Sequence, residues 1–262
     1  MTDYHVHTTY CDGVSGAEDV VVSAIKKGVR ILGFSGHSFN VYDGTYCMDR
    51  DTTAYREEIS ALRERYKDKI TILCGIERDK TTKELDAEFD FVIGSVHHVV
   101  VNGEDIPVDN TPELLKDGID RLLGGDIYAF CERYYDDVAT LAEEIRPDII
   151  GHFDLITKFT EKGFPIDGEN PRYVAAYTKA IERIVPLGIP FEINTGAISR
   201  GYRTTPYPSL SIIKKISEMG GKFILTSDSH AANTICFEFL KWRKTAEELG
   251  LTVLDELSLR KN

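Results

Sequence analysis

The sequence has few cysteines, and they are scattered. Cys11, Cys47, Cys74, Cys131 and Cys236 are an odd number of thiols among 262 residues, and no two of them form a C-x-x-C pair. The spacing that marks a Cys-rich structural zinc site or a dithiol redox centre is therefore missing. Scattered free thiols are typical of proteins in reducing compartments. We expect a cytoplasmic protein without structural disulfides.

Long apolar runs and an excess of basic residues are also missing. No segment approaches the length of a membrane span, and we expect no cleaved presequence, because the N-terminus has neither its basic nor its apolar region. Lys and Arg number 31 against 43 Asp and Glu, which gives a net charge of −12. Binding to nucleic-acid polymers depends on cations that neutralise phosphates, so this balance argues against such partners. A small phosphorylated ligand held by one or two local cations is compatible with it.

The chain has no Pro-, Gly- or Ser-rich linker and no internal repeat, so we expect residues 1–262 to form one domain. Short apolar runs alternate with amphipathic helical patterns, which predicts parallel strands joined by helices. One helix is expected within 111–130 and a separate one from Tyr134 to the residues before Pro147. No G-x-G-x-x-G motif or P-loop follows the first strand, which favours an α/β barrel over an open doubly wound sheet. The expected strands cover residues 3–7, 31–37, 70–77, 89–98, 148–152, 189–195 and 222–230.

Every histidine falls at or just after the C-terminal end of an expected strand. The seven are His5, His7, His37, His97, His98, His152 and His230. Acidic residues take similar positions, namely Asp12, Glu77, Asp154 and Asp228. In a parallel barrel these strand ends share one face, and closure brings the first strand next to the last. His5 and His7 have the same i, i+2 spacing as Asp228 and His230, so each pair can point to one place. The pattern predicts a metal site that draws on every strand but the sixth.

The candidate ligands are too many for one ion. Two or three ions would share them, with Glu77 as a bridge, and the mixture of imidazole and carboxylate suits Zn, Mn or Fe. Neighbouring ions activate water and stabilise an in-line displacement at phosphorus, so phosphate-ester hydrolysis is the expected reaction class. The candidates are His5, His7, Asp12, His37, Glu77, either His97 or His98, His152, Asp228 and His230.

Six motifs, in their order along the chain, resemble the polymerase-and-histidinol-phosphatase (PHP) family: "HVHTTYCDG", "GFSGHS", "GIE", "GSVHH", "GHFDLI" and "SDSH". The segments "YDGTYCM", "RPDIIGHFDLITKF" and "EINTGAISRGYRTTPYPS" are similar to its histidinol-phosphate phosphatase branch. The resemblance implies a distorted (βα)7 TIM-like barrel that holds three divalent transition metal ions. On the matching positions, His5, His7, Glu77 and Asp228 would hold one ion, Glu77, His97 and His152 a second, and Asp12, His37 and His230 a third. His98 would then support the site or face the substrate.

The same resemblance implies hydrolysis of L-histidinol phosphate to L-histidinol and phosphate in histidine biosynthesis. A metal-bridging hydroxide would attack phosphorus. Among the cations after the fifth and sixth strands, Arg200 is the first candidate for a phosphate contact, followed by Lys158 and Arg203. Asp154 would orient a metal ligand or protonate the leaving alcohol. Candidate contacts for the imidazole and amine of the substrate are Phe39, Tyr42, Tyr46 and Asp79.

Three other functions stay open. A PHP phosphoesterase could act on a mononucleotide or another small phosphate ester. A metal-dependent amidohydrolase also begins with H-x-H, but Glu77 and the pair of Asp228 and His230 fit the PHP pattern better. A PHP-like interaction module that has lost its metals should show gaps among the ligands, and none of the nine positions is vacant.

Overall fold

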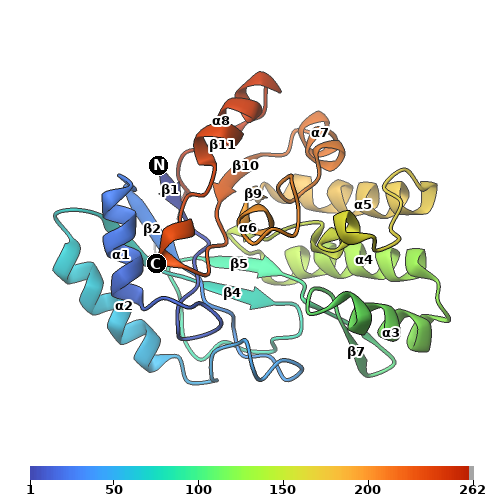
Figure 1. The fold of residues 1–262 in the computed structure, drawn as a ribbon, viewed down its shortest axis with the longest axis horizontal. Coiled ribbons are helices and arrows are strands. Elements are labelled where there is room, and N and C mark those ends of the chain that lie inside the picture. Colours follow the sequence, from blue (N-terminus) through green and yellow to red (C-terminus); the bar gives the residue numbers. More distant parts are fainter. Residues whose placement is uncertain (260–262) are drawn as a thin grey trace.

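Parallel strands form the centre of the fold, and helices surround them (Figure 1). The computed structural model describes residues 1–259. One sheet has the order β1-β2-β3 and another the order β11-β10-β9-β8-β5-β4, and all of these pairs are parallel. A separate antiparallel hairpin consists of β6 and β7. The strands are β1 (Thr2–Asp3), β2 (Ile31–Phe34), β3 (Thr71–Cys74), β4 (Ile76–Asp79), β5 (Val92–Ser95), β6 (His98–Val101), β7 (Glu104–Pro107), β8 (Ile149–Ile150), β9 (Phe191–Asn194), β10 (Phe223–Thr226) and β11 (Val253–Leu254).

The first seam between the two sheets is crossed by a strand that bends at Gly75, between β3 and β4. The Gly75 N–H donates to the Phe34 carbonyl (2.8 Å) and the Glu77 N–H to the Gly36 carbonyl (3.1 Å), so the chain of β2 runs beside both halves. A Cβ atom at position 75 would lie 2.3 Å from the ring of Phe91, which explains why the bend requires glycine. The bend carries the barrel from β2 to β5.

The second seam is closed by the chain just beyond β1 and β10. Val6 pairs in parallel with Ser229. The His7 N–H donates to the Ser229 carbonyl (2.8 Å), and the Ser229 N–H donates to the His5 carbonyl (3.1 Å). The order β1, β2, β3–β4, β5, β8, β9, β10 is therefore a seven-position barrel, which confirms the predicted fold class and the predicted contact between the first and last strands.

A buried carboxylate distorts this second seam near the start of the strands. Asp3 accepts the backbone N–H groups of Ser227 and Cys236, each at 3.0 Å, in place of direct strand pairing. β11 pairs with β10 at the same end. Burial raises the pKa of Asp3, against the lowering effect of these hydrogen bonds. The barrel is thus closed by backbone bonds only where the two strands end.

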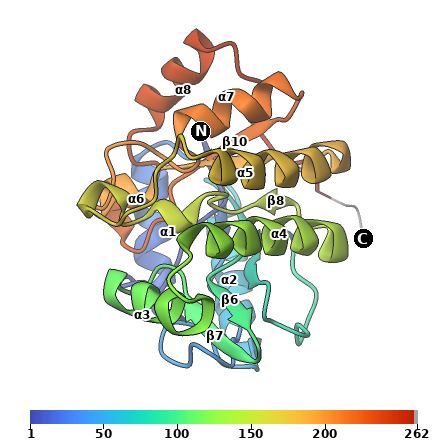
Figure 2. The same cartoon turned by 90° about the vertical axis from the view of Figure 1, so that its right-hand side faces the viewer.

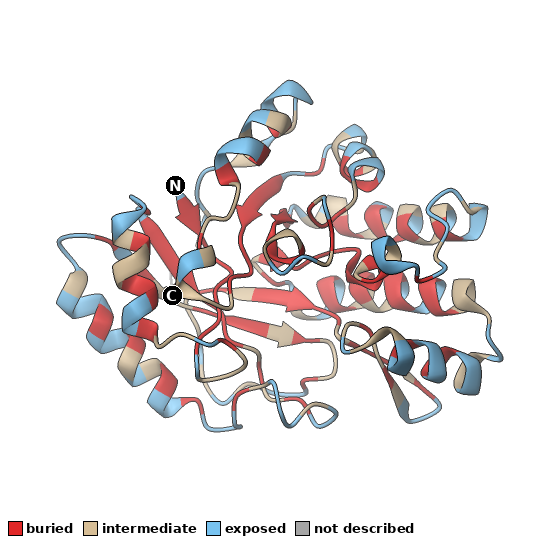
Figure 3. Ribbon diagram, viewed as in Figure 1, coloured by how far each residue is buried: buried red, intermediate tan, exposed pale blue. Residues whose placement is uncertain are grey.

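The helices cover the outside of the barrel. α4 and α5 lie side by side, and β8 appears between them in a second view (Figure 2). α4 also packs against β5. The strands are buried, whereas the outer faces of the helices are exposed (Figure 3). The α-helices are α1 (Ala17–Lys26), α2 (Thr53–Tyr66), α3 (Pro112–Leu123), α4 (Ile127–Ile145), α5 (Pro171–Ile184), α6 (Gly196–Ser199), α7 (Leu210–Glu218) and α8 (Phe239–Glu248), and short 3-10 helices cover Leu155–Thr157, Thr160–Lys162, Val185–Leu187 and Ala232–Thr234.

The barrel interior is apolar towards the start of its strands. Tyr4 and Phe91 meet edge to face there, with ring centroids 5.6 Å apart, and they pack with Ile93, Ile149 and Ile224. This apolar plug fills the space as side chains do in parallel barrels. The polar residues of the strands lie at the opposite end.

The helix boundaries differ from the sequence prediction in one region. The chain breaks at Gly124 and Gly125, which have φ values of 62° and 81°, and α4 then runs without interruption through Tyr134, where a separate helix was expected to begin. The hairpin of β6 and β7, strand β11 and helix α8 were not predicted. Among residues 1–259, no helix is both long and apolar enough to cross a bilayer.

Candidate metal centre

Imidazole and carboxylate side chains converge at the C-terminal ends of the barrel strands. They form four overlapping groups, and within each group one ligand atom per residue lies within 4.8 Å of the others. The groups are His7, Asp12, His37 and His230; His5, His7 and Asp228; His5, Glu77 and His152; and His37, Glu77 and His97. Together they contain every side chain proposed as a ligand from the sequence, with His97 rather than His98.

Glu77 lies at the centre of these groups. It is on β4, and 1% of it is exposed. Its Oε2 atom is 2.8 Å from His37 Nδ1 and 3.2 Å from His5 Nε2. Its Oε1 atom is 2.9 Å from His152 Nε2 and 3.4 Å from His97 Nε2. Burial alone would raise the pKa of Glu77, but the nearby imidazoles hold it well below its usual range. A carboxylate that reaches several imidazoles through both oxygens suits a bridging ligand.

Asp12 serves a second part of the cluster. It is in the loop after His7, and its Oδ2 atom is 3.0 Å from His230 Nε2. Its Oδ1 atom is 3.6 Å from both His37 Nε2 and His7 Nδ1. Burial would raise the pKa of Asp12, but the hydrogen bond to His230 and the nearby imidazole of His37 hold this pKa well below its usual range. The first strand therefore reaches two sides of the cluster from one loop.

Asp228 completes the cluster from the last strand. Its Oδ1 atom is 3.3 Å from His7 Nε2 and 3.7 Å from His5 Nε2. Arg200 fixes the other side of this carboxylate, with Nη2 3.0 Å from Oδ2 and Nη1 donating to the Asp228 carbonyl at 2.6 Å. Asp228 has a φ of 45°, which is uncommon for a residue with a side chain and is often found at functional sites.

Several polar atoms inside the cluster lack hydrogen-bond partners although they are buried. They include Nε2 of His5 and of His7, Oδ1 of Asp12 and Oε2 of Glu77. Buried polar atoms normally have partners. Ligand atoms around a tetrahedral ion with bonds of about 2.0–2.2 Å lie about 3.3–3.6 Å from one another, and His7 Nε2 lies 3.3 Å from Asp228 Oδ1 and 3.6 Å from Glu77 Oε2. This set of nitrogen and oxygen donors fits divalent metal ions.

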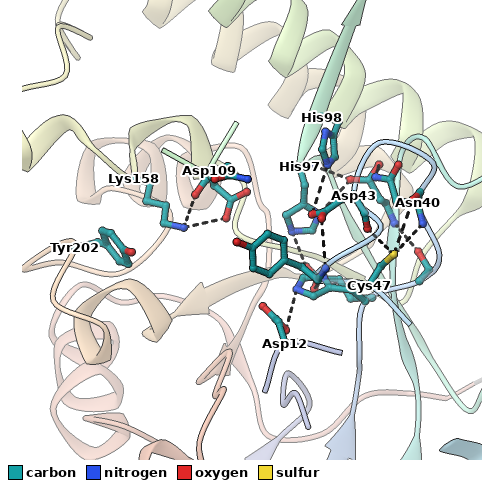
Figure 4. Close-up of a pocket in the computed structure, with 15 residues that line it drawn as sticks. Asp12, Asn40, Asp43, Cys47, His97, His98, Asp109, Lys158 and Tyr202 are labelled. Atoms are coloured by element: carbon teal, nitrogen blue, oxygen red, sulfur yellow. Dashed lines mark hydrogen bonds and ion pairs between the residues drawn. The ribbon is translucent and has the colours of Figure 1, made fainter. Parts of the chain in front are cut away.

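A cavity of about 210 Å³ opens onto the cluster (Figure 4). Lys158 and Asp109 face each other on one side of it; Lys158 Nζ donates to the Asp109 carbonyl (2.6 Å) and lies 3.0 Å from its Oδ2. Burial would raise the pKa of Asp109, but the Lys158 ammonium lowers it. The cavity is lined by Asp12, His37, Ser38, Asn40, Asp43, Tyr46, Cys47, Glu77, Asp79, His97, His98, Asp109, Asn110, Lys158 and Tyr202. Its wall thus joins the metal-binding groups to loop residues of both charges.

The PHP domain family matches residues 3–196, which is most of the chain. The chain belongs to the PHP family. Curated PHP relatives include the probable histidinol-phosphatase of Schizosaccharomyces pombe, 27% identical over 95% of this chain and 87% of the relative. The histidinol-phosphatase of Bacillus subtilis is 26% identical over 90% of this chain and 96% of that protein. The predicted family membership is confirmed.

Two solved PHP structures have the same fold. The putative histidinol phosphatase of Listeria monocytogenes superposes with a TM-score of 0.79 at 20% identity, covering 92% of this chain and all of that one. The histidinol phosphate phosphatase of Lactococcus lactis superposes with a TM-score of 0.71 at 22% identity, covering 99% and 98% of the two chains. The Lactococcus lactis protein was solved with zinc, L-histidinol and phosphate.

The PHP chain holds two of its predicted phosphate contacts at the site and one behind it. Arg200 touches Asp228, and Lys158 lines the cavity. Arg203 is 7% exposed and is not among the lining residues. Its guanidinium bonds Thr157, lies 3.6 Å from the Asp154 carboxylate and stacks on the Tyr207 ring at 4.6 Å. Arg203 would have to leave these partners to reach a phosphate.

Asp154 is also directed away from the histidines. One of its oxygens accepts the Ser209 N–H (2.9 Å) and faces Arg203. The other is buried without a hydrogen-bond partner. Among the described residues no histidine side chain bonds this carboxylate, so the predicted role of orienting a metal ligand has no direct contact to support it.

Among the predicted substrate contacts, Asp79 and Tyr46 line the cavity, as does His98. Asp79 holds His97, because its Oδ2 atom accepts the His97 N–H (2.8 Å) and lies 3.1 Å from its Nδ1. Burial lowers the pKa of His97, but Glu77 and Asp79 outweigh it and raise the pKa to about 10.

The remaining predicted contacts lie at the edge of the site or outside it. His98 points to Asp105, 3.1 Å from Nδ1, and Tyr42 lies beside its ring with centroids 5.9 Å apart. Phe39 packs under the Arg50 guanidinium at 4.0 Å and lines a different cavity. Of the predicted substrate contacts, Phe39 and Tyr42 are not among the residues that line the reaction cavity.

Sequence reasoning missed three acidic residues: Asp43 and Asp109, which line the cavity, and Glu192, which supports the cluster from behind. Glu192 on β9, the sixth barrel strand, lies 2.6 Å from His5 Nδ1, so this strand supports a candidate metal ligand although it supplies none to the four groups. Its signal was a charged residue inside the buried run "IPFEINT". Asp109 follows the hairpin that was not predicted, so no strand end drew attention to it.

Proposed function

We propose that this PHP protein is a metal-dependent phosphomonoesterase that hydrolyses L-histidinol phosphate to L-histidinol and phosphate in histidine biosynthesis. The observation that carries the proposal is the convergence of nine imidazole and carboxylate side chains, some with unpartnered buried atoms, in one cluster. Asp12, His37, Glu77 and His97 of this cluster line the cavity that opens onto it. Similarity to curated histidinol-phosphatases over nearly the whole chain supports this substrate. We take residues 1–262 as a single catalytic domain.

The proposed ligand sets follow the groups at the strand ends. His5, His7, Glu77 and Asp228 would hold one ion, Glu77, His97 and His152 a second, and Asp12, His37 and His230 a third. The contacts of Glu77 agree with this division in part, since it reaches His5 through one oxygen and His152 and His97 through the other. The oxygen that faces His5 also lies 2.8 Å from His37 Nδ1, so Glu77 adjoins the third set as well. Zn, Mn and Fe are the candidates, because each accepts mixed imidazole and carboxylate ligands.

The chain's own cations would bind the phosphate group. When bound, the divalent ions lower the pKa of a water molecule and neutralise phosphate charge. Arg200 is part-exposed beside Asp228 and His230, so its guanidinium can present N–H donors to phosphate oxygens next to the ions. Lys158 lies across the cavity with its ammonium balanced by Asp109. Lys158 would act from the cavity wall and Arg200 from beside Asp228.

Groups on the outer wall of the cavity suit the amine and imidazole of the substrate. The carboxylates of Asp43 and Asp109 can accept N–H donors from an ammonium or an imidazole. Tyr46 can pack against the imidazole ring, while His98 is fixed between Asp43 and Asp105. We expect Asp79 to act through His97 rather than through the substrate, because its Oδ2 atom is already bonded to that histidine.

A substrate panel tests this function directly. Initial rates with L-histidinol phosphate, nucleoside monophosphates and p-nitrophenyl phosphate should be compared for enzyme loaded with Zn or Mn. We expect L-histidinol phosphate to be preferred in kcat/KM by at least tenfold, which corresponds to about 1.4 kcal/mol of transition-state discrimination. Equal rates on all esters would contradict the assignment of L-histidinol phosphate as the specific substrate and would indicate a general PHP phosphoesterase. Absence of turnover with every ester would contradict the proposed phosphatase activity.

A further inference from the structure

Glu192 is a carboxylate buried in the wall of the barrel, with no exposed surface. Its Oε1 atom lies 2.6 Å from Nδ1 of His5. Its Oε2 atom accepts the backbone N–H of His152 (2.8 Å) and the side-chain amide of Asn194 (3.0 Å). The same Asn194 amide lies 3.3 Å from Oδ2 of Asp228. One carboxylate and one amide on β9 therefore touch residues from the first, fifth and last barrel strands.

Burying this charge is not explained by stability alone. A buried carboxylate loses its hydration and is retained only when charged or hydrogen-bonding groups compensate for the loss. Within the described part of the chain, His5 is the only ion-pair partner of Glu192. Glu77, Asp228 and Glu192 all act on His5, so the surroundings are acidic and favour cations. The two residues next to Glu192 on this strand, Phe191 and Ile193, are buried and apolar.

The contact between His5 and Glu192 determines which ring nitrogen of His5 is available to a metal ion. Because Nδ1 is bonded to Glu192, Nε2 is the atom that points at Glu77 and Asp228, and Nε2 has no hydrogen-bond partner. A hydrogen bond from the second ring nitrogen to a carboxylate fixes the tautomer and orientation of a metal-binding histidine. The other oxygen of the same group accepts the backbone N–H of His152, so one carboxylate fixes the His5 ring and the main chain that carries the His152 ring. The centroids of the two rings are 5.9 Å apart.

We propose that Glu192, supported by Asn194, is the positioning residue that orients His5 and His152 together for metal binding. The proposal rests on the proposed metal-dependent function but concerns residues to which that function assigns no part. Glu192 touches neither the cavity nor the site proposed for the substrate. It acts through the two histidines, and Asn194 extends its effect to Asp228.

The test measures metal binding rather than turnover alone. Glu192→Gln keeps the size of the side chain but replaces one acceptor oxygen by a donor, so His5 and the His152 N–H can no longer both be bonded. We expect the affinity for Zn or Mn, measured by competition with a chromophoric chelator, to fall about 10- to 100-fold. Metal counted by mass spectrometry should fall by about one equivalent per chain. With saturating metal, kcat should fall while KM stays unchanged, because Glu192 does not contact substrate.

Asp154→Asn is the matched control, because Asp154 is an equally buried carboxylate that bonds no histidine. Its metal affinity should stay within about threefold of wild type. If Glu192→Gln is insoluble, Asn194→Ala carries the test, since it keeps the Glu192 carboxylate but removes one hydrogen bond from its Oε2 and one from Oδ2 of Asp228. A smaller loss of affinity is expected. Full metal content and wild-type affinity in the soluble variant would overturn the proposal. That result is distinct from failure of the proposed function, which the wild-type substrate panel reports.

Discussion

Nε2 of His7 lies 3.3 Å from Oδ1 of Asp228, although the two residues come from the first and last strands of the barrel. The contact exists because Val6 and Ser229 pair directly beside it. Metal binding and closure of the second seam therefore depend on the same few residues. The barrel is held shut at the end where the proposed ions would lie.

Replacement of Asp228 should remove metal much as replacement of His7 does. Asp228→Asn is the preferred variant, because Asn tolerates the φ of 45° at this position whereas Ala would add backbone strain. We expect at least a 100-fold loss of kcat and the loss of about one metal equivalent, measured by mass spectrometry of the purified protein. His7→Asn serves as the comparison. Full metal content in Asp228→Asn would contradict the assignment of Asp228 as a ligand.

Removal of metal should destabilise the fold. Glu77, Asp12 and Asp228 each lie in a group of candidate ligands, and bound ions would balance their charge. A ligand that binds only the folded state raises its stability. Dialysis against dipicolinate should lower the melting temperature by several degrees, and added Mn or Zn should restore it. Calorimetry or circular dichroism measures the shift. If chelation removes the metal but leaves the melting temperature unchanged, the ions do not stabilise the fold at this site.

Much of the metal centre could be predicted from sequence because its ligands follow strand ends. In a parallel barrel the position of a residue at the end of a strand determines the face on which it lies. This rule could not decide between His97 and His98. Neighbouring residues on an extended chain point to opposite sides, and the sequence does not show which of the two sides faces the cluster. The structure separates them: His97 follows β5 and faces Glu77, whereas His98 begins β6 and faces Asp105.

The supporting residues could not be predicted with the same rule. Glu192 lies within a strand rather than at its end, and its role depends on which neighbour its side chain faces across the barrel. Arg203 follows the sixth strand as Arg200 does, yet a turn of the chain sends one guanidinium to Asp154 and the other to Asp228. Tertiary contacts determine the partner of each of these side chains, and the periodicity of the sequence gives no information about such contacts.

Replacement of Lys158 should change substrate binding, whereas replacement of Arg203 should lower the free energy of unfolding. Lys158 lines the cavity, so Lys158→Met should raise KM for L-histidinol phosphate about tenfold while the free energy of unfolding changes little. Arg203→Met would leave the buried Asp154 carboxylate without its cation, at a cost of about 3 kcal/mol in the free energy of unfolding. Steady-state kinetics and urea denaturation separate the two effects.

The double variant Asp154→Asn with Arg203→Met provides the control for this contrast. It should recover part of the stability lost in Arg203→Met, because no unpaired charge is left behind. A large rise in KM for Arg203→Met with unchanged stability would instead assign Arg203 to phosphate binding.

Asp137 gives the protein a pH-dependent instability away from the metal centre. Burial on α4 raises the pKa of Asp137 to about 6, although the cations of Arg133 and Lys80 oppose it. In the unfolded chain the pKa of an aspartate is about 3.9. The folded state thus binds this proton more tightly, so the ionised carboxylate costs stability as the pH rises from about 4 to 6 and costs it in full above that range. Asp137→Asn should therefore melt at a higher temperature than wild type at pH 7.5, and the gap should narrow as the pH falls through 6.

Comparison of variants at each pH removes the contribution of the metal ligands, since protonation of those ligands affects both proteins alike. Asp136→Asn is the control on the same helix. Its carboxylate is exposed and lies 2.7 Å from Arg183, so its loss should give no stabilisation at any pH. A constant gap between Asp137→Asn and wild type from pH 7.5 to pH 5 would show that the effect comes from packing rather than from the charge. Only a gap that begins to narrow near pH 6 and closes towards pH 4 identifies the desolvated carboxylate as the cause.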